Sequence, residues 1–147
     1  MRDTSTITDK EKLALRDAVE FSCDYWMVDP SMIFSKDRAR RLVYARHSAK
    51  YYLTYLHKNL SLPKIAQLTE CDHSSVIHSR DTFEDLTYSE SDFAILKRRL
   101  VVRKDKNELE GITKTLFTEI QTIITTKLSI DAKTEAMIDL FKQYENR

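Results

Sequence analysis

The sequence is poor in glycine and proline, the residues that favour turns and interrupt helices. Its 147 residues include one glycine and two prolines, and this scarcity predicts an all-α fold. Because Gly111 is the sole glycine, a glycine-rich phosphate-binding loop is excluded, and no bound nucleotide is expected. The length leaves room for one domain and a modest appendage.

Long apolar runs are missing as well, and cysteines are few. No stretch approaches membrane-spanning length and the first residues lack a signal-peptide core, so we expect a cytoplasmic protein without a membrane partner. Cys23 and Cys71 fit a reducing compartment, where a disulfide is not expected. Cys71, His73 and His78 lack a recognised ligand spacing, so we expect no metal and no other cofactor. No nucleophile and base occur in a supporting context, so we do not expect an enzyme.

The net charge of +1 conceals an uneven distribution of charge. Residues 31–66 contain eight basic residues and one acidic residue, whereas residues 67–94 contain one basic residue and seven acidic residues. A local basic cluster in a nearly neutral chain can supply phosphate contacts without indiscriminate polyelectrolyte binding. A solvated basic helix face is the alternative interpretation.

The segment that begins at Asp72 is predicted to open a helix. Asp72 is a suitable N-cap, the short polar residues His73 and Ser74 follow it, and Val76 and Phe83 fall on the side to be buried. DNA-reading proteins place short polar side chains of this first turn against base edges. The hypothesis is therefore a recognition helix.

A second short helix is predicted immediately before it, over residues 61–68. Ser61 is a plausible N-cap, Pro63 is tolerated in the first turn, and apolar residues repeat at three-residue spacing. A turn of residues 69–71, which contains no glycine, then leads to Asp72. Helix, tight turn and helix together predict a helix-turn-helix, and an ordinary packed helix pair is the alternative.

Residues from roughly Ala18 to Lys104 resemble the C-terminal DNA-binding domain of the bacterial replication initiator DnaA. Three segments carry the resemblance, residues 35–47, 61–66 and 72–78, in the family's order and at nearly its distances. The last resembles the family's most specific motif, Asp-His-Thr-Thr-Val-x-His, with both threonines replaced by serine. The resemblance implies a Trp-repressor/DnaA-type helix-turn-helix bundle. It also implies a nucleoid-associated regulator of replication initiation or transcription that binds double-stranded DNA, at an A·T-rich initiator-type site.

The resemblance also implies individual contacts. Arg38, on a basic loop ahead of a long helix, matches the arginine that enters the minor groove. Asp72, His73 and Ser74 match residues that touch base edges in the major groove, although Ser74 lacks the methyl group that threonine packs against thymine. For Arg80, pairing with Glu84 at i+4 is an equal alternative to a phosphate contact. The phosphate contacts expected around these residues are Arg40, Arg46, Lys50, Ser61, Lys64, Ser75 and Arg80.

The remaining helices of the first domain are predicted from caps and apolar spacing. A capping box of Thr8 and Glu11 begins a helix that ends at about Asp24, and residues 25–34 form a loop with a short helical turn. A long helix over residues 40–59 carries an apolar stripe and, on another face, Arg46 and Lys50 open to phosphates. After a polar turn at residues 87–91, a closing helix follows through Phe93, Leu96 and Leu100.

We predict two domains, residues 1–104 as the DNA-binding domain and residues 105–147 as a helical extension. The extension contains an amphipathic helix and a last helix from about Ile130, which form a hairpin. This hairpin must bury its apolar face on the domain, on a second copy in a homodimer, or on another protein. The alternative function is therefore a protein-interaction module that uses the hairpin or the tyrosine stripe Tyr44, Tyr51 and Tyr55, for which packing at the core edge is the favoured interpretation.

Overall fold

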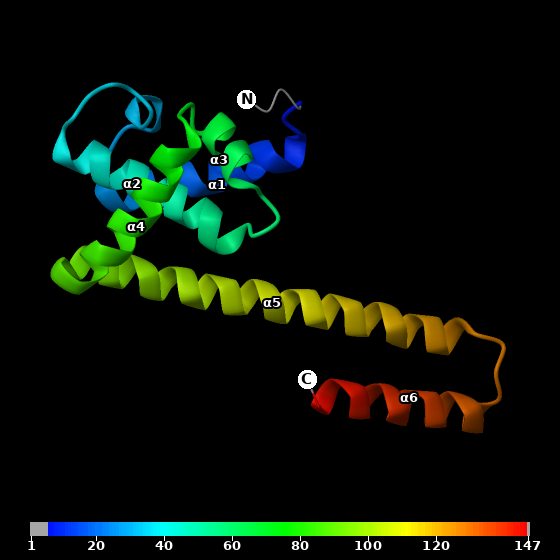
Figure 1. The fold of residues 1–147 in the computed structure, drawn as a ribbon. Coiled ribbons are helices and arrows are strands. Elements are labelled where there is room, and N and C mark those ends of the chain that lie inside the picture. The colour runs from blue at the N-terminus through cyan, green and yellow to red at the C-terminus, as the bar shows by residue number, and fades with distance from the viewer. Residues whose placement is uncertain (1–5, 147) are drawn as a thin grey trace. The chain divides into compact units, whose positions relative to one another are not determined.

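The computed structural model describes residues 6–146, and within that range the chain forms helices and no strand (Figure 1). The all-α prediction is confirmed. The elements are α1 (Asp9–Trp26), the 3₁₀-helix η1 (Pro30–Met32), α2 (Arg40–Leu56), α3 (Leu62–Leu68), α4 (His73–Ser89), α5 (Ser91–Thr125) and α6 (Ile130–Glu145). The chain divides into two compact units, of which the first ends at Val102 and the second begins at Arg103. No helix in the described part combines the length and hydrophobicity needed to cross a membrane.

Helix α1 begins with the predicted capping box. The Thr8 backbone N–H donates to Glu11 Oε2 at 2.7 Å, and the Glu11 N–H donates to Thr8 Oγ1 at 3.2 Å. The helix continues to Trp26, so the expectation of a loop from Tyr25 was wrong for its first two residues. Burial explains the difference, because the Trp26 indole packs inside the first unit and its Nε1 donates to Ser48 Oγ at 2.9 Å.

Helix α2 supplies the centre of the core. Its predicted stripe is confirmed, since four of its residues are buried and Leu56 is half-buried against the core; the buried residues are Leu42, Ala45, Ala49 and Leu53. Tyr51 is also buried and its ring stacks on that of Phe83 in α4, with centroids 4.0 Å apart. Tyr44 and Tyr55 are half-buried against the core, so the tyrosine stripe packs at and inside the core edge, as favoured above.

The turn between α3 and α4 contains no glycine, and Glu70 adopts a strained backbone conformation there. Glu70 has φ 55°, a left-handed conformation that usually favours glycine. The turn is closed by the Cys71 N–H, which donates to the Ala66 carbonyl at 2.9 Å. On α4, Val76 and Phe83 are completely buried, as predicted, and they fix this helix on the core.

The junction after α4 is shorter than predicted. Helix α4 runs to Ser89 and only Glu90 separates it from α5, so the expected turn at residues 87–91 was wrong. Complete burial of Phe93, Leu96 and Leu100 holds the first part of α5 in the core of the first unit.

The second unit contains the rest of α5 and all of α6. The closing helix and the first helix of the extension, expected to be separate, are one continuous helix. Its threonine-rich end is helical despite the β-branched residues, and hydroxyl groups such as those of Thr118 and Thr122 donate to carbonyls four residues earlier. Helix α6 begins at Ile130 as predicted, with Ser129 as N-cap.

Candidate nucleic-acid interface

The first turn of α4 presents a polar surface built by its own cap. Asp72 Oδ1 accepts from the Ser75 backbone N–H and from Ser74 Oγ, both at 2.8 Å. The hydrogen bond from the Ser75 backbone is the main cause that lowers the pKa of Asp72 below its usual value, so this carboxylate is charged at neutral pH. Asp72, His73 and Ser74 are exposed, whereas Ser75 is half-buried.

The basic loop before α2 is shaped by local hydrogen bonds. Asp37 Oδ1 accepts from the Ala39 N–H at 2.8 Å, and Arg38 between them is exposed. Arg46 on α2 donates through Nε to the Ile33 carbonyl and through Nη2 to Ser35 Oγ. Arg46 therefore holds the base of the loop that carries Arg38, which gives it a positioning role.

Arg40 lies at the first residue of α2 and contacts the acidic junction after α4. Its Nη2 is 3.1 Å from Glu90 Oε1, and its Nε donates to the Tyr44 hydroxyl at 2.9 Å. The Arg40 side chain is nevertheless 72% exposed. Surface ion pairs of this kind contribute little net stability, so a phosphate group can compete for the guanidinium.

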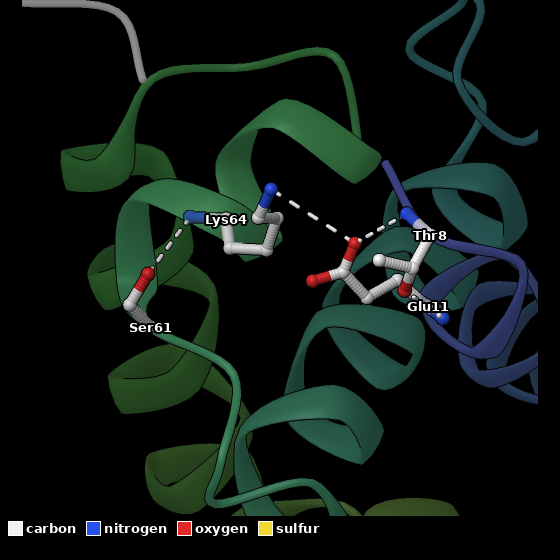
Figure 2. Close-up of polar contacts among 4 residues, drawn as sticks. All are labelled: Thr8, Glu11, Ser61 and Lys64. Carbon is white, nitrogen blue, oxygen red and sulfur yellow. Dashed lines mark hydrogen bonds and ion pairs between the residues drawn. The ribbon is translucent and has the colours of Figure 1, made fainter. Parts of the chain in front are cut away.

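Two lysines expected on the open surface are buried. Lys50 is 8% exposed and Lys64 is 9% exposed, so the expectation that Lys50 lies on an open face of its helix was wrong. Lys64 Nζ lies 3.9 Å from Glu11 Oε2, the carboxylate that also closes the α1 capping box (Figure 2). Because tertiary packing covers both side chains, neither is presented as a phosphate contact in this conformation.

Ser61 keeps its predicted local role. It is exposed and its Oγ accepts from the Lys64 backbone N–H at 3.3 Å, which caps α3 (Figure 2). Arg80 is half-buried and pairs with its neighbour Asp81 at 3.0 Å, so the alternative pairing with Glu84 was wrong.

Glu84 instead joins three helices, a role that sequence reasoning missed. It accepts from the Tyr51 hydroxyl of α2 and from Lys97 Nζ of α5. Burial, followed by the hydrogen bond to Glu84, raises the pKa of Tyr51. The i+4 spacing had pointed to Arg80, and no local pattern indicates a partner 33 residues away. This network fixes the orientation of α4 relative to α2.

A second contact between α2 and α4 was also missed. His47 Nδ1 shares a 3.0 Å hydrogen bond with Ser79 Oγ, and the His47 and His78 ring centroids are 6.0 Å apart. Burial, helped by the positive charge of Lys50, lowers the pKa of His47 to about 4, so the ring is neutral near pH 7. His47 is therefore a structural contact behind the first turns of α4.

Comparison with known proteins agrees with this geometry. Residues 17–82, from within α1 into α4, match the family model described as the bacterial DnaA protein helix-turn-helix. The chromosomal replication initiator protein DnaA of Nautilia profundicola is 31% identical over 102 residues, which cover 66% of this chain. The chain spans 23% of the length of that relative. The matched region contains α3, the turn and the first part of α4, so these residues are similar to the bacterial DnaA helix-turn-helix.

Proposed function

We propose that the first unit binds double-stranded DNA through α3 and α4 and regulates the initiation of replication or transcription at sites resembling A·T-rich initiator boxes. The observation that carries the proposal is the exposed polar first turn of α4. Its residues Asp72, His73 and Ser74 face solvent, while Val76 and Phe83 are completely buried on the same helix. A rigid helix with a solvent-facing polar N-terminus has the form required for major-groove reading.

The proposed base contacts follow from the chemistry of the three exposed side chains. The Asp72 carboxylate accepts from a cytosine amino group, and the His73 ring bonds a base edge as donor or acceptor. Ser74 already donates to Asp72, so its oxygen is left to accept from a base. Arg38, on its exposed loop, supplies the minor-groove contact.

Burial reduces the number of side chains that can contact DNA phosphates. The exposed or half-buried groups Arg40, Ser61, Ser75 and Arg80 are the proposed backbone contacts, with Arg40 exchanging Glu90 for a phosphate. Arg46 positions the Arg38 loop, and the buried Lys50 and Lys64 are left out of the contact set. Backbone N–H groups in the first turn of α4 would add an anion-binding contribution.

The test measures binding to labelled duplexes that contain either an A·T-rich initiator-type box or a scrambled sequence, across a salt series. Wild-type protein is expected to prefer the box, and its affinity should fall with increasing salt because counterions are released. Arg38→Ala and His73→Ala should each reduce affinity for the box by about 5- to 150-fold, equivalent to roughly 1–3 kcal/mol per base contact, and reduce the preference.

Lys10→Ala is the matched control, since Lys10 is an exposed cation at the beginning of α1. It should leave the preference for the box unchanged. A selection from random duplexes provides the cognate site if the box itself is not preferred. Absence of any selected sequence, with no effect of either substitution, would overturn the proposal.

We further propose that residues 105–147 form an association segment that does not read DNA. The extension carries exposed apolar side chains that a DNA-reading surface does not require, such as Phe117 and Phe141. This favours protein association for the extension, beside DNA binding by the first unit.

A further inference from the structure

The hairpin of the second unit has almost no core of its own. Leu140 is its one buried hydrophobic residue in the described range, although α5 and α6 run alongside each other (Figure 1). The Tyr144 hydroxyl donates to Glu119 Oε2 at 2.9 Å, and Lys133 Nζ donates to the Ile124 carbonyl at 2.8 Å. A unit of about 40 residues rarely buries enough apolar surface to be stable alone, so this hairpin requires another surface that covers its apolar side chains.

The inner faces of the two helices are identified by partial burial. Leu116 and Ile123 on α5, together with Met137 and Leu140 on α6, are half-buried or buried. Each of these four residues is followed directly by a large apolar residue that is exposed. The exposed residues are Phe117, Ile124, Ile138 and Phe141.

These exposed residues lie on one side of the hairpin. One step along an α-helix rotates the side chain by about 100° in the same sense about each axis. The two helices are antiparallel and their inner faces point toward each other. A rotation of about 100° from each inner face therefore turns the exposed residues of α5 and those of α6 toward the same side of the hairpin. Ile130 lies on this side as well, because it precedes Phe141 by 11 residues, which is about three helical turns. We call this surface the outer apolar face, consisting of Phe117, Ile124, Ile130, Ile138 and Phe141.

The size of the outer apolar face suits a protein interface. Its five side chains are between 48% and 83% exposed. Covering them in two copies removes roughly 1,000 Å² of accessible surface, which is near the lower limit for a specific interface.

The charges of the hairpin favour a second copy as the cover. Residues 103–146 contain seven basic and eight acidic residues, with both signs on each helix. The hairpin therefore has no excess of positive charge to attract a nucleic acid or an anionic membrane. Two identical hairpins can also approach each other without net repulsion. A two-fold pairing of like surfaces closes on itself and leaves no further face to cover.

We propose that the outer apolar face packs against the same face of a second copy, so that two hairpins form a four-helix bundle and the protein is a homodimer. The pairing places aromatic and branched side chains from all four helices in one core, as in other bundles. This inference goes beyond the proposed DNA binding and does not depend on it. In combination, the two would give a dimer with two DNA-reading units.

The test is the mass of the full-length chain in solution, measured by light scattering coupled to gel filtration over a range of concentrations. Wild type is expected at twice the mass of one chain. Phe117→Glu combined with Phe141→Glu should give the mass of one chain. The matched control, Thr122→Glu combined with Gln143→Glu, adds the same charge at exposed positions outside the outer apolar face and should remain dimeric.

The helicity of the same samples is measured by circular dichroism, so that loss of the dimer can be interpreted even if the substituted hairpin unfolds. Dilution of wild type should then lower helicity as dimers dissociate, because the hairpin loses its cover. A wild-type mass of one chain at up to about 100 µM, or a Phe117/Phe141 variant that stays dimeric, would overturn the inference. DNA binding is measured separately on a single-site duplex, so failure of one proposal is distinguished from failure of the other.

Discussion

Replacement of Phe83 by alanine should destabilise the first unit strongly. Phe83 is completely buried in α4, stacked on Tyr51 at 4.0 Å and edge-on to Phe93 at 5.1 Å between ring centroids. Phe83→Ala is expected to lower the free energy of unfolding by about 3–5 kcal/mol, since it creates a cavity and removes apolar contacts. The loss of its aromatic pairs, at about 0.5–1.5 kcal/mol, is part of that total.

The assay is urea unfolding followed by Trp26 fluorescence. Trp26 is the only tryptophan of the chain and lies in the core of the first unit, 5.2 Å from Phe93 between ring centroids, so its emission reports this unit. Phe83→Leu, which retains most of the volume, should cost less than Phe83→Ala. Tyr88→Ala is the control on the same helix, because Tyr88 is 88% exposed, and it should change stability by less than about 0.5 kcal/mol.

If Phe83→Ala and Tyr88→Ala had similar small effects, Phe83 would not anchor α4 and the packing of α4 on α2 would be wrong. A loss within the expected range, with DNA affinity falling in parallel, would link core packing to the position of the turn proposed to read DNA.

Two further predictions concern the turn and the α2–α4 contact. Glu70→Gly should raise the free energy of unfolding by about 0.5–1 kcal/mol because it relieves the left-handed strain at φ 55°, whereas Glu70→Ala keeps the Cβ and should not; equal effects in denaturant titrations would contradict the strain. The pKa of His47 falls to about 4 in the folded protein, so the unfolded chain binds a proton first as pH decreases, and stability should decrease from about pH 6.5 down to about pH 4. In a His47→Gln variant, the decrease in the free energy of unfolding between about pH 6.5 and about pH 4 should be smaller by roughly 2–3 kcal/mol. An unchanged pH profile of unfolding would show that His47 titrates normally.

Local sequence patterns predicted most of the first unit. The caps at Thr8, Ser61 and Asp72 act over three residues, so the sequence alone carries the information for where these helices begin. The buried side of α4 could also be predicted, because Val76 and Phe83 are seven residues apart, about two helical turns, and lie on one face. The motif at residues 72–78 predicted the helix-turn-helix, although it carries no information on the left-handed conformation of Glu70 in the turn.

The site was predicted less completely than the helices that carry it. Arg38, Asp72, His73 and Ser74 are exposed, as contact with DNA requires, while their contacts with DNA remain predictions. A lysine on an amphipathic helix gives no indication of whether its side chain reaches solvent or turns toward a carboxylate on another helix.

The sequence by itself determined the all-α class, the caps at which α1, α3 and α4 begin and the identity of the polar turn, since these depend on composition or on residues within one or two turns of each other. Only the tertiary structure decided that Lys64 pairs with Glu11, that Arg46 holds the Arg38 loop and that Glu84 joins Tyr51 to Lys97. The physical reason is distance along the chain. Charged side chains choose partners by proximity in space and by burial, and both are fixed only when α1, α2, α4 and α5 pack together.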